Sequence, residues 1–159
     1  MWINLVAMPF ALEEFPYIDL LTPTVAPALE RTTNTVAITE AGRAELSWVS
    51  GLPIAGLKSR LKVKFFGPDG QPRDDLETFM GAFAHLVGFS EDYRSLLHIH
   101  PVDESPASTS VAGLEKKGGP ELEFVFIVPK QGYMRLFVQT QVGGKPILFA
   151  FGFEVRTIP

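Results

Sequence analysis

The chain has 159 residues, of which 46% are hydrophobic and 20% are charged, and it contains no cysteine. This length and composition predict a globular protein with one domain, or one domain and a long arm. The net charge of -4 comes without a run of Lys or Arg, which argues against nucleic-acid binding, and the lack of cysteine excludes disulfides and thiolate metal sites.

Residues 1–33 are predicted to form an N-terminal arm. Residues 1–12 are uncharged and mostly apolar, but they lack a basic segment and are too short to span a bilayer, so we expect neither a signal peptide nor a transmembrane helix. Residues 13–33 mix prolines with apolar side chains and show no regular period, which predicts an extended course. Apolar side chains in such an arm need cover, from the same domain or from a protein partner. The residues predicted to dock are Phe10, Phe15, Tyr17 and Leu21.

Residues 34–159 alternate apolar and polar side chains in short runs, which predicts strands. The runs cover residues 35–41, 43–50, 57–66, 121–129, 133–142 and 146–155. Gly143-Gly144 is typical of a two-residue hairpin turn, because glycine adopts positive φ without strain. Asp74–Phe79 is predicted to form one helical turn, and residues 102–120 a long loop. The pattern favours an all-β fold, an antiparallel β-sandwich.

All three histidines of the chain lie between residues 79 and 101. If Ser90–Arg94 closes a hairpin, His85 lies on one strand, and His98 and His100 lie on its neighbour. Residues two apart on a strand project to the same face, so His98 and His100 should point the same way. The three imidazoles then predict a copper or zinc site, to which Met80 could add a thioether ligand.

Each of these residues also has an alternative interpretation. His85 shares its strand parity with Phe83 and Phe89, so it could be an ordinary histidine of a sheet face, with His98 and His100 facing solvent. Met80 could simply pack against its aromatic neighbours. Enzymatic activity is not expected, because Gly88-Phe89-Ser90 lacks the second glycine of a nucleophile elbow and no glycine-rich phosphate loop is present.

The order of motifs resembles a group of bacterial extracytoplasmic β-sandwich domains, often found near copper and heavy-metal handling proteins. Their M-G-M-x-x-H element, H-x-H-P element and late P-x-x-G-x-Y/R strand correspond to Met80-Gly81 with His85, His98–Pro101 and Pro129–Tyr133. The likeness covers about residues 60 to 157, and Ala82 and Val111 stand where that group often has methionine. The resemblance implies an immunoglobulin-like or cupredoxin-like sandwich outside the cytoplasm, in a periplasmic or cell-surface location.

Two functions follow as expectations. The first is a non-enzymatic accessory subunit whose arm, residues 1–33, docks on a protein partner in an extracytoplasmic or membrane-associated assembly, while residues 34–159 form the sandwich. The second is a module that binds copper or zinc through the histidines. Docking predicts an arm that is protected only in a complex, whereas metal binding predicts stoichiometric metal in the isolated domain.

Overall fold

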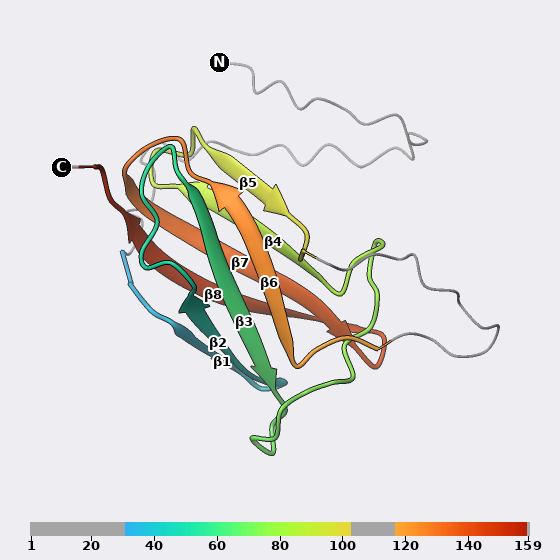
Figure 1. The fold of residues 1–159 in the computed structure, drawn as a ribbon. Helices are drawn as coiled ribbons and strands as arrows, with labels where there is room; N and C mark the ends of the chain where they lie inside the picture. Colours follow the sequence, from blue (N-terminus) through green and yellow to red (C-terminus); the bar gives the residue numbers. More distant parts are fainter. Residues whose placement is uncertain (1–30, 103–116, 159) are drawn as a thin grey trace, which may run out of the picture.

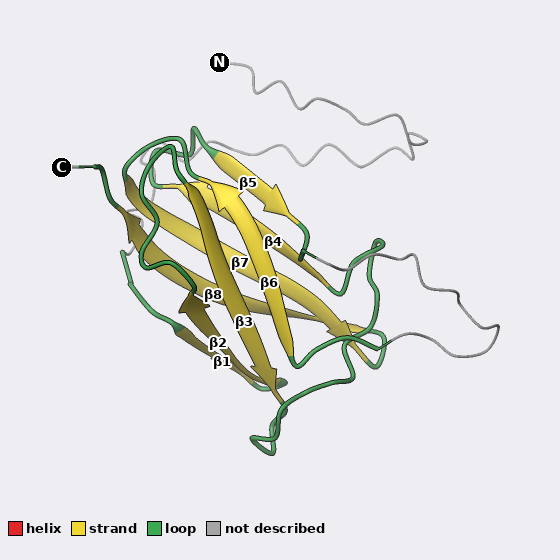
Figure 2. Ribbon diagram, viewed as in Figure 1, coloured by secondary structure: helices red, strands yellow, loops and turns green. Residues whose placement is uncertain are grey.

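The computed structural model describes residues 31–102 and 117–158 (Figure 1). This part of the chain consists of strands and loops, with no helix in it (Figure 2). The eight strands are β1 (Val36–Thr39), β2 (Gly42–Trp48), β3 (Lys58–Phe66), β4 (Ala84–Ser90), β5 (Leu96–Ile99), β6 (Glu121–Ile127), β7 (Gly132–Val142) and β8 (Lys145–Val155). Since the described residues contain no helix, none of them forms an apolar helix that could cross a membrane.

The strands form two four-stranded sheets that lie one over the other (Figure 1). One sheet has the order β1-β2-β3-β6, the other has the order β5-β4-β7-β8, and every neighbouring pair of strands is antiparallel. The predicted all-β antiparallel β-sandwich is therefore confirmed. The predicted turn at Gly143-Gly144 is also present, with φ of 57° and 71°, and it joins the two longest strands, β7 and β8.

The core lies between the sheets because each strand turns alternate side chains inward. On β3 the inward residues Leu61, Val63 and Phe65 are fully buried, whereas the lysines between them are partly exposed. Aromatic rings join the layers: Phe65 and Phe149 have centroids 5.8 Å apart, and Trp48 and Phe153 have centroids 4.8 Å apart. The same alternation, predicted for residues 121–129, 133–142 and 146–155, holds in β6, β7 and β8.

The segment before β4 differs from the sequence prediction. A helical turn over Asp74–Phe79 is wrong, because this segment is extended and forms isolated bridges. The N–H of Leu76 donates to the carbonyl of Gly118 at 3.1 Å, and the N–H of Glu77 donates to the carbonyl of Gln141 at 2.8 Å. Burial of Leu76 fixes this course, since one isolated helical turn has too few hydrogen bonds to compete with it.

The outer face of the first sheet carries ion pairs as well as exposed apolar side chains such as Ile38 and Ile127. On the first sheet, β3 and β6 carry charged side chains that form ion pairs across the strands, including Lys62 with Glu121 at 2.7 Å and Arg60 with Glu123. The second sheet turns apolar side chains and the three histidines outward. We call its larger exposed and half-buried apolar residues the apolar face, and they are Val87, Phe89, Leu96, Phe137 and Leu148.

The predicted docking residues Phe10, Phe15, Tyr17 and Leu21 lie outside the described residues. The described chain begins with Arg31, Thr32 and Thr33. Asn34 then joins the sandwich, because its N–H donates to the carbonyl of Gly152 at 3.1 Å and its side-chain amide donates to the carbonyl of Ala150 at 3.1 Å.

Candidate metal centre

His85 lies at the start of β4, on the outer side of the second sheet. Its strand neighbours Ala84 and Leu86 point into the core, so the pleat sends His85 to the opposite side. Even so, only 5% of His85 is exposed. The ring of Phe79 covers it edge-on, with centroids 6.0 Å apart, and the rings of His98 and His100 lie beside it. The residue is thus a covered histidine on a sheet face.

The predicted hairpin brings His98 and His100 to the same place. The strands β4 and β5 are joined through a turn in which the N–H of Ser90 donates to the carbonyl of Ser95 at 3.0 Å. In the antiparallel register His98 is opposite Val87, and His100 follows directly after β5, beside His85. The ring centroids of His85 lie 5.6 Å from His98 and 4.6 Å from His100. We call these three residues the histidine cluster.

The ring nitrogens of the cluster converge. One ligating nitrogen from each ring can be chosen so that all three lie within 4.8 Å of one another. Nδ1 of His85 and Nε2 of His98 are 3.3 Å apart. Two nitrogens bound at about 2.0–2.1 Å to a tetrahedral zinc are separated by about 3.3–3.4 Å, so this pair already has the spacing of two ligands. His100, the third candidate ligand, is exposed, and its ring nitrogen would have to move closer to the other two to complete the triangle.

A backbone carbonyl orients the ring of His85. Nε2 of His85 lies 2.7 Å from the carbonyl oxygen of Phe79, and because a carbonyl only accepts, Nε2 must carry the proton. When the ring is neutral, Nδ1 of His85 carries the lone pair, and this atom faces Nε2 of His98. Histidines that bind metals usually donate their other N–H to such an acceptor, which fixes the tautomer and the ring orientation.

The acceptor itself sits on a tight turn. The N–H of Phe79 donates to the carbonyl of Ala82 at 2.8 Å, and the N–H of Ala82 donates back at 3.2 Å. Met80 and Gly81 between them have φ of 50° and 86°, a conformation that suits glycine and is uncommon for methionine. The Phe79 carbonyl therefore belongs to a defined turn, which holds it against His85.

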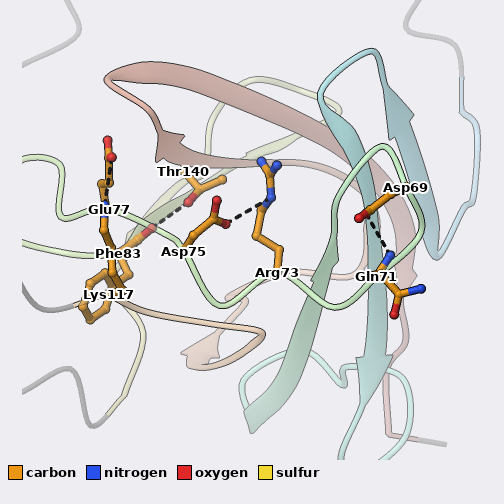
Figure 3. Close-up of polar contacts among 8 residues, drawn as sticks. All are labelled: Asp69, Gln71, Arg73, Asp75, Glu77, Phe83, Lys117 and Thr140. Carbon is orange, nitrogen blue, oxygen red and sulfur yellow. Dashed lines mark hydrogen bonds and ion pairs between the residues drawn. The ribbon is translucent and has the colours of Figure 1, made fainter.

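The turn is held in place from both sides. The hydroxyl of Thr140 donates to the carbonyl of Phe83 at 2.8 Å, and the ammonium of Lys117 donates to the carboxylate of Glu77 at 3.0 Å (Figure 3). The other carboxylate oxygen of Glu77 accepts the N–H of Gly144 at 2.7 Å. Glu77 thus ties the segment before the turn to the β7–β8 hairpin and to Lys117.

Electrostatics favour the neutral form of His100. Although the side chain of His100 is exposed, partial loss of hydration lowers its pKa below the usual 6.5, and the nearby imidazoles of His85 and His98 lower it further when they carry charge. A neutral imidazole has the lone pair that a metal needs. Around neutral pH the cluster therefore presents His100 in the state that can bind a metal.

A family model described as "Domain of unknown function (DUF8832)" matches residues 38–157. The chain belongs to this family. The matched region contains the whole histidine cluster and excludes the arm. The comparison with curated proteins found no match.

Two solved structures have similar chain paths at low sequence identity. A DUF4426 family protein, PA0388 of Pseudomonas aeruginosa PAO1, has a TM-score of 0.47 and 8% identity, covering 79% of this chain and 100% of that one. A DUF4785 family protein, lpg0956 of Legionella pneumophila subsp. pneumophila strain Philadelphia 1, has a TM-score of 0.43 and 10% identity, covering 74% of this chain and 29% of that one.

Two further polar or sulfur-containing side chains in the segment that contains the histidines, those of Met80 and Asp92, have other surroundings in this DUF8832 domain. Met80, the predicted additional ligand, is 76% exposed and therefore does not pack in the core. Asp92, in the turn between β4 and β5, accepts from the Ser90 hydroxyl at 2.6 Å and the Arg94 N–H at 3.0 Å, so its carboxylate is engaged within the turn. The Ser90 bond is the larger cause of its lowered pKa. Val111 lies outside the described residues.

Glu77 provides a pH-dependent test of the support around the turn. The Gly144 N–H, then Lys117 and Gln141, hold the pKa of Glu77 at about 2, below its ordinary 4.5. A lowered pKa in the folded state means that the carboxylate stabilises the fold above pH 4.5, and that this contribution is lost as the pH falls through 2. We expect Glu77→Gln to be less stable than the wild type at pH 7, with the difference shrinking between pH 4.5 and 2.

Urea denaturation at pH 7, 4.5 and 2.5 measures this effect, with Asp75→Asn as the control. The side chain of Asp75 is half exposed and pairs only with Arg73 among the described residues, at 3.2 Å. An equal pH dependence for Glu77→Gln and the wild type would show that Glu77 does not hold the turn.

Proposed function

We propose that this domain binds one divalent transition-metal ion, Cu²⁺ or Zn²⁺, through His85, His98 and His100. The observation that carries the proposal is the 3.3 Å spacing between Nδ1 of His85 and Nε2 of His98, together with the Phe79 carbonyl that turns Nδ1 toward the cluster. The third imidazole, from His100 just after β5, converges with those from β4 and β5 and supports a three-ligand site.

The same spacing also fits a hydrogen bond between His85 and His98, so the two interpretations must be compared. At 3.3 Å the contact is longer than the 2.9–3.0 Å that is typical of N–H hydrogen bonds, roughly by 0.3 Å. A hydrogen-bonded pair also gives no role to His100, which lies 4.6 Å from His85 and 5.2 Å from His98 between ring centroids. A shared metal ion accounts for all three positions.

The ligand chemistry narrows the choice of metal. Imidazole suits zinc, copper, nickel and iron, whereas magnesium and calcium prefer oxygen ligands. Among the described residues the cluster contains histidines alone, without a carboxylate, and the chain has no cysteine that could supply a thiolate. Since His98 and His100 are exposed, a further coordination position would face solvent, where Met80 or water could fill it.

The role that we propose is non-enzymatic and extracytoplasmic. Its support is the sequence resemblance to extracytoplasmic sandwich domains found near copper-handling proteins, which also suggests the immunoglobulin-like or cupredoxin-like type. The alternative role, an accessory subunit docked on a protein partner through its arm, depends on residues 1–30. The apolar face is compatible with docking, because it exposes hydrophobic side chains that a binding partner could cover.

Metal titration of the purified chain tests the proposal. We expect Cu²⁺ and Zn²⁺ to bind with a stoichiometry of one near pH 7.5, and His98→Ala or His100→Ala to weaken binding by at least about 100-fold, because a lost ligand should cost more than a lost outer-shell partner. Isothermal titration calorimetry gives the affinity. Since the chain has only three histidines, imidazole NMR signals identify the ligands directly.

Leu96→Ala is the matched control, because Leu96 is two residues before His98 on the same face of β5 and is 59% exposed. It should leave metal affinity unchanged. Unchanged affinity in both histidine variants, or no binding by the parent chain, would reduce the cluster to a hydrogen-bonded pair and a surface histidine.

A further inference from the structure

The apolar face has members on all four strands of the second sheet. In the register, Phe89 lies opposite Leu96 on β5, and Val87 lies opposite Phe137 on β7. Phe89 and Phe137 contact each other edge-on, with centroids 6.3 Å apart. Leu96 and Leu148 are 59% and 54% exposed. Hydrophobic side chains that adjoin one another on a surface in this way usually have a binding partner.

The chain enters the described structure on this same side of the sheet. The hydroxyl of Tyr133, which projects from the outer side of β7, donates to the carbonyl of Thr32 at 3.0 Å, and Tyr133 is buried. Thr32 also lies against Gly152 of β8, where its carbonyl occupies the space that a side chain would need. Glycine at this position is therefore required for the backbone to approach so closely.

The path of residues 34 to 31 leads across the sheet. Asn34 is bonded to Gly152 on β8, Thr32 to Tyr133 on β7, and Arg31 forms an ion pair with Glu91 just after β4. These contacts cross the strands in the order β8, β7, β4. The preceding residues, 1–30, are thus attached at the corner of the apolar face where β4 turns toward β5.

From this attachment we infer that residues 1–30 of the same chain cover the apolar face. Thirty residues can span up to about 100 Å, whereas the eleven residues of β7 extend over about 37 Å, so reach is not limiting. Prolines keep the arm from forming a helix and suit an extended course over a sheet. The apolar side chains Phe10, Phe15, Tyr17 and Leu21 then find their cover on the chain's own sheet.

Tethering favours this occupant over a second copy or a separate protein. A segment fixed at Thr32 meets the face at an effective concentration in the millimolar range, without the cost of bringing two molecules together. Charge is compatible as well. Residues 1–30 contain four acidic side chains and no Lys or Arg, and Arg135 projects from the apolar face, 5.9 Å from the ring of Phe137.

Site-specific photo-cross-linking of the full chain tests the inference. A benzophenone amino acid is placed at Leu96 or Leu148, and at Ile38 as the control, because Ile38 is 77% exposed on the other sheet. We expect Leu96 and Leu148 to form intramolecular cross-links to peptides from residues 1–30 at least about tenfold more often than Ile38 does, since only the former lie on the tethered face. Mass spectrometry identifies the linked peptides.

Substitutions in residues 1–30 show whether the cross-links depend on packing of apolar side chains or only on the closeness of a tethered segment. The pair Phe15→Asp with Leu21→Asp should lose most of these cross-links, while Thr22→Asp with Thr24→Asp, which adds the same charge, should keep them. Cross-linked dimers would overturn the inference in favour of a second copy. The inference would also be wrong if Leu96 and Leu148 formed cross-links to residues 1–30 no more often than Ile38 does, in a chain shown to be folded by circular dichroism. The apolar face would then be a binding surface for a separate protein partner. Both outcomes are independent of metal binding.

Discussion

Replacing Phe151 with alanine is expected to lower the free energy of unfolding by about 3–5 kcal/mol. Phe151 is fully buried at the centre of β8, opposite Leu136 of β7, so the substitution removes a large apolar side chain and leaves a cavity between the sheets. Urea denaturation followed by circular dichroism measures the change.

Leu148→Ala on the same strand is the control for this prediction. Leu148 lies on the outer side of β8 and is 54% exposed, so without any cover by residues 1–30 its loss should change the free energy of unfolding by no more than about 0.5 kcal/mol. A similar loss for the two variants would contradict the assignment of inner and outer sides. The inferred cover by residues 1–30 would raise the cost of Leu148→Ala modestly, and the same variant made without residues 1–30 separates that contribution.

The strands were predictable because one side of each is buried and the other is not. In β6 the apolar residues Leu122, Phe124 and Phe126 alternate with Glu121 and Glu123, and the structure buries the former while the latter form ion pairs. A period of two is a local signal, so a single sequence displays it. The order of the strands in the two sheets has no such local signal, since it depends on contacts between distant residues.

The course of residues 74–79 shows where local reasoning fails. Asp74–Phe79 contains acidic residues followed by apolar ones, a pattern that also suits a helical turn. Its backbone instead bonds to Gly118 and Gln141, which lie more than forty residues away. Those partners become available only once the sandwich has formed, so no window around residue 76 could have revealed them. The turn after it did leave a trace, because Gly81 is the residue type that positive φ favours.

The histidine cluster was only partly predictable. The hairpin and the period of two were sufficient to place His98 and His100 near His85. They could not show that His85 is covered while its two partners are exposed, nor that its Nε2 is engaged by Phe79. The bond depends on the turn at Met80-Gly81, which places the carbonyl of Phe79, six residues before His85, against the imidazole. It determines which nitrogen faces the cluster, and so it determines which atom of His85 is offered to a metal.

Metal binding should raise the stability of the fold if the histidine cluster is a binding site. A ligand that binds only the folded state adds about 2.7 kcal/mol to the free energy of unfolding when its free concentration is about 100 times the dissociation constant. For a domain of this size the midpoint of thermal unfolding should rise by roughly 5 to 11 °C. Differential scanning calorimetry with Zn²⁺ or Cu²⁺, and again after adding a chelator, measures this shift.

The variant His98→Ala should remove the metal-dependent shift and have little effect on the metal-free midpoint. His98 is exposed, so its replacement should cost little packing energy. His85 is covered, so its replacement would remove a candidate ligand and also disturb packing. Leu96→Ala, on the same face of β5, should retain the full shift. An equal metal-dependent rise in His98→Ala would mean that the ion stabilises the fold from another place, and a fall in all variants would mean that it binds the unfolded chain. A shift that depends on His98 requires the ring nitrogens to act together in the folded state, because three separate imidazoles bind as well in the unfolded chain.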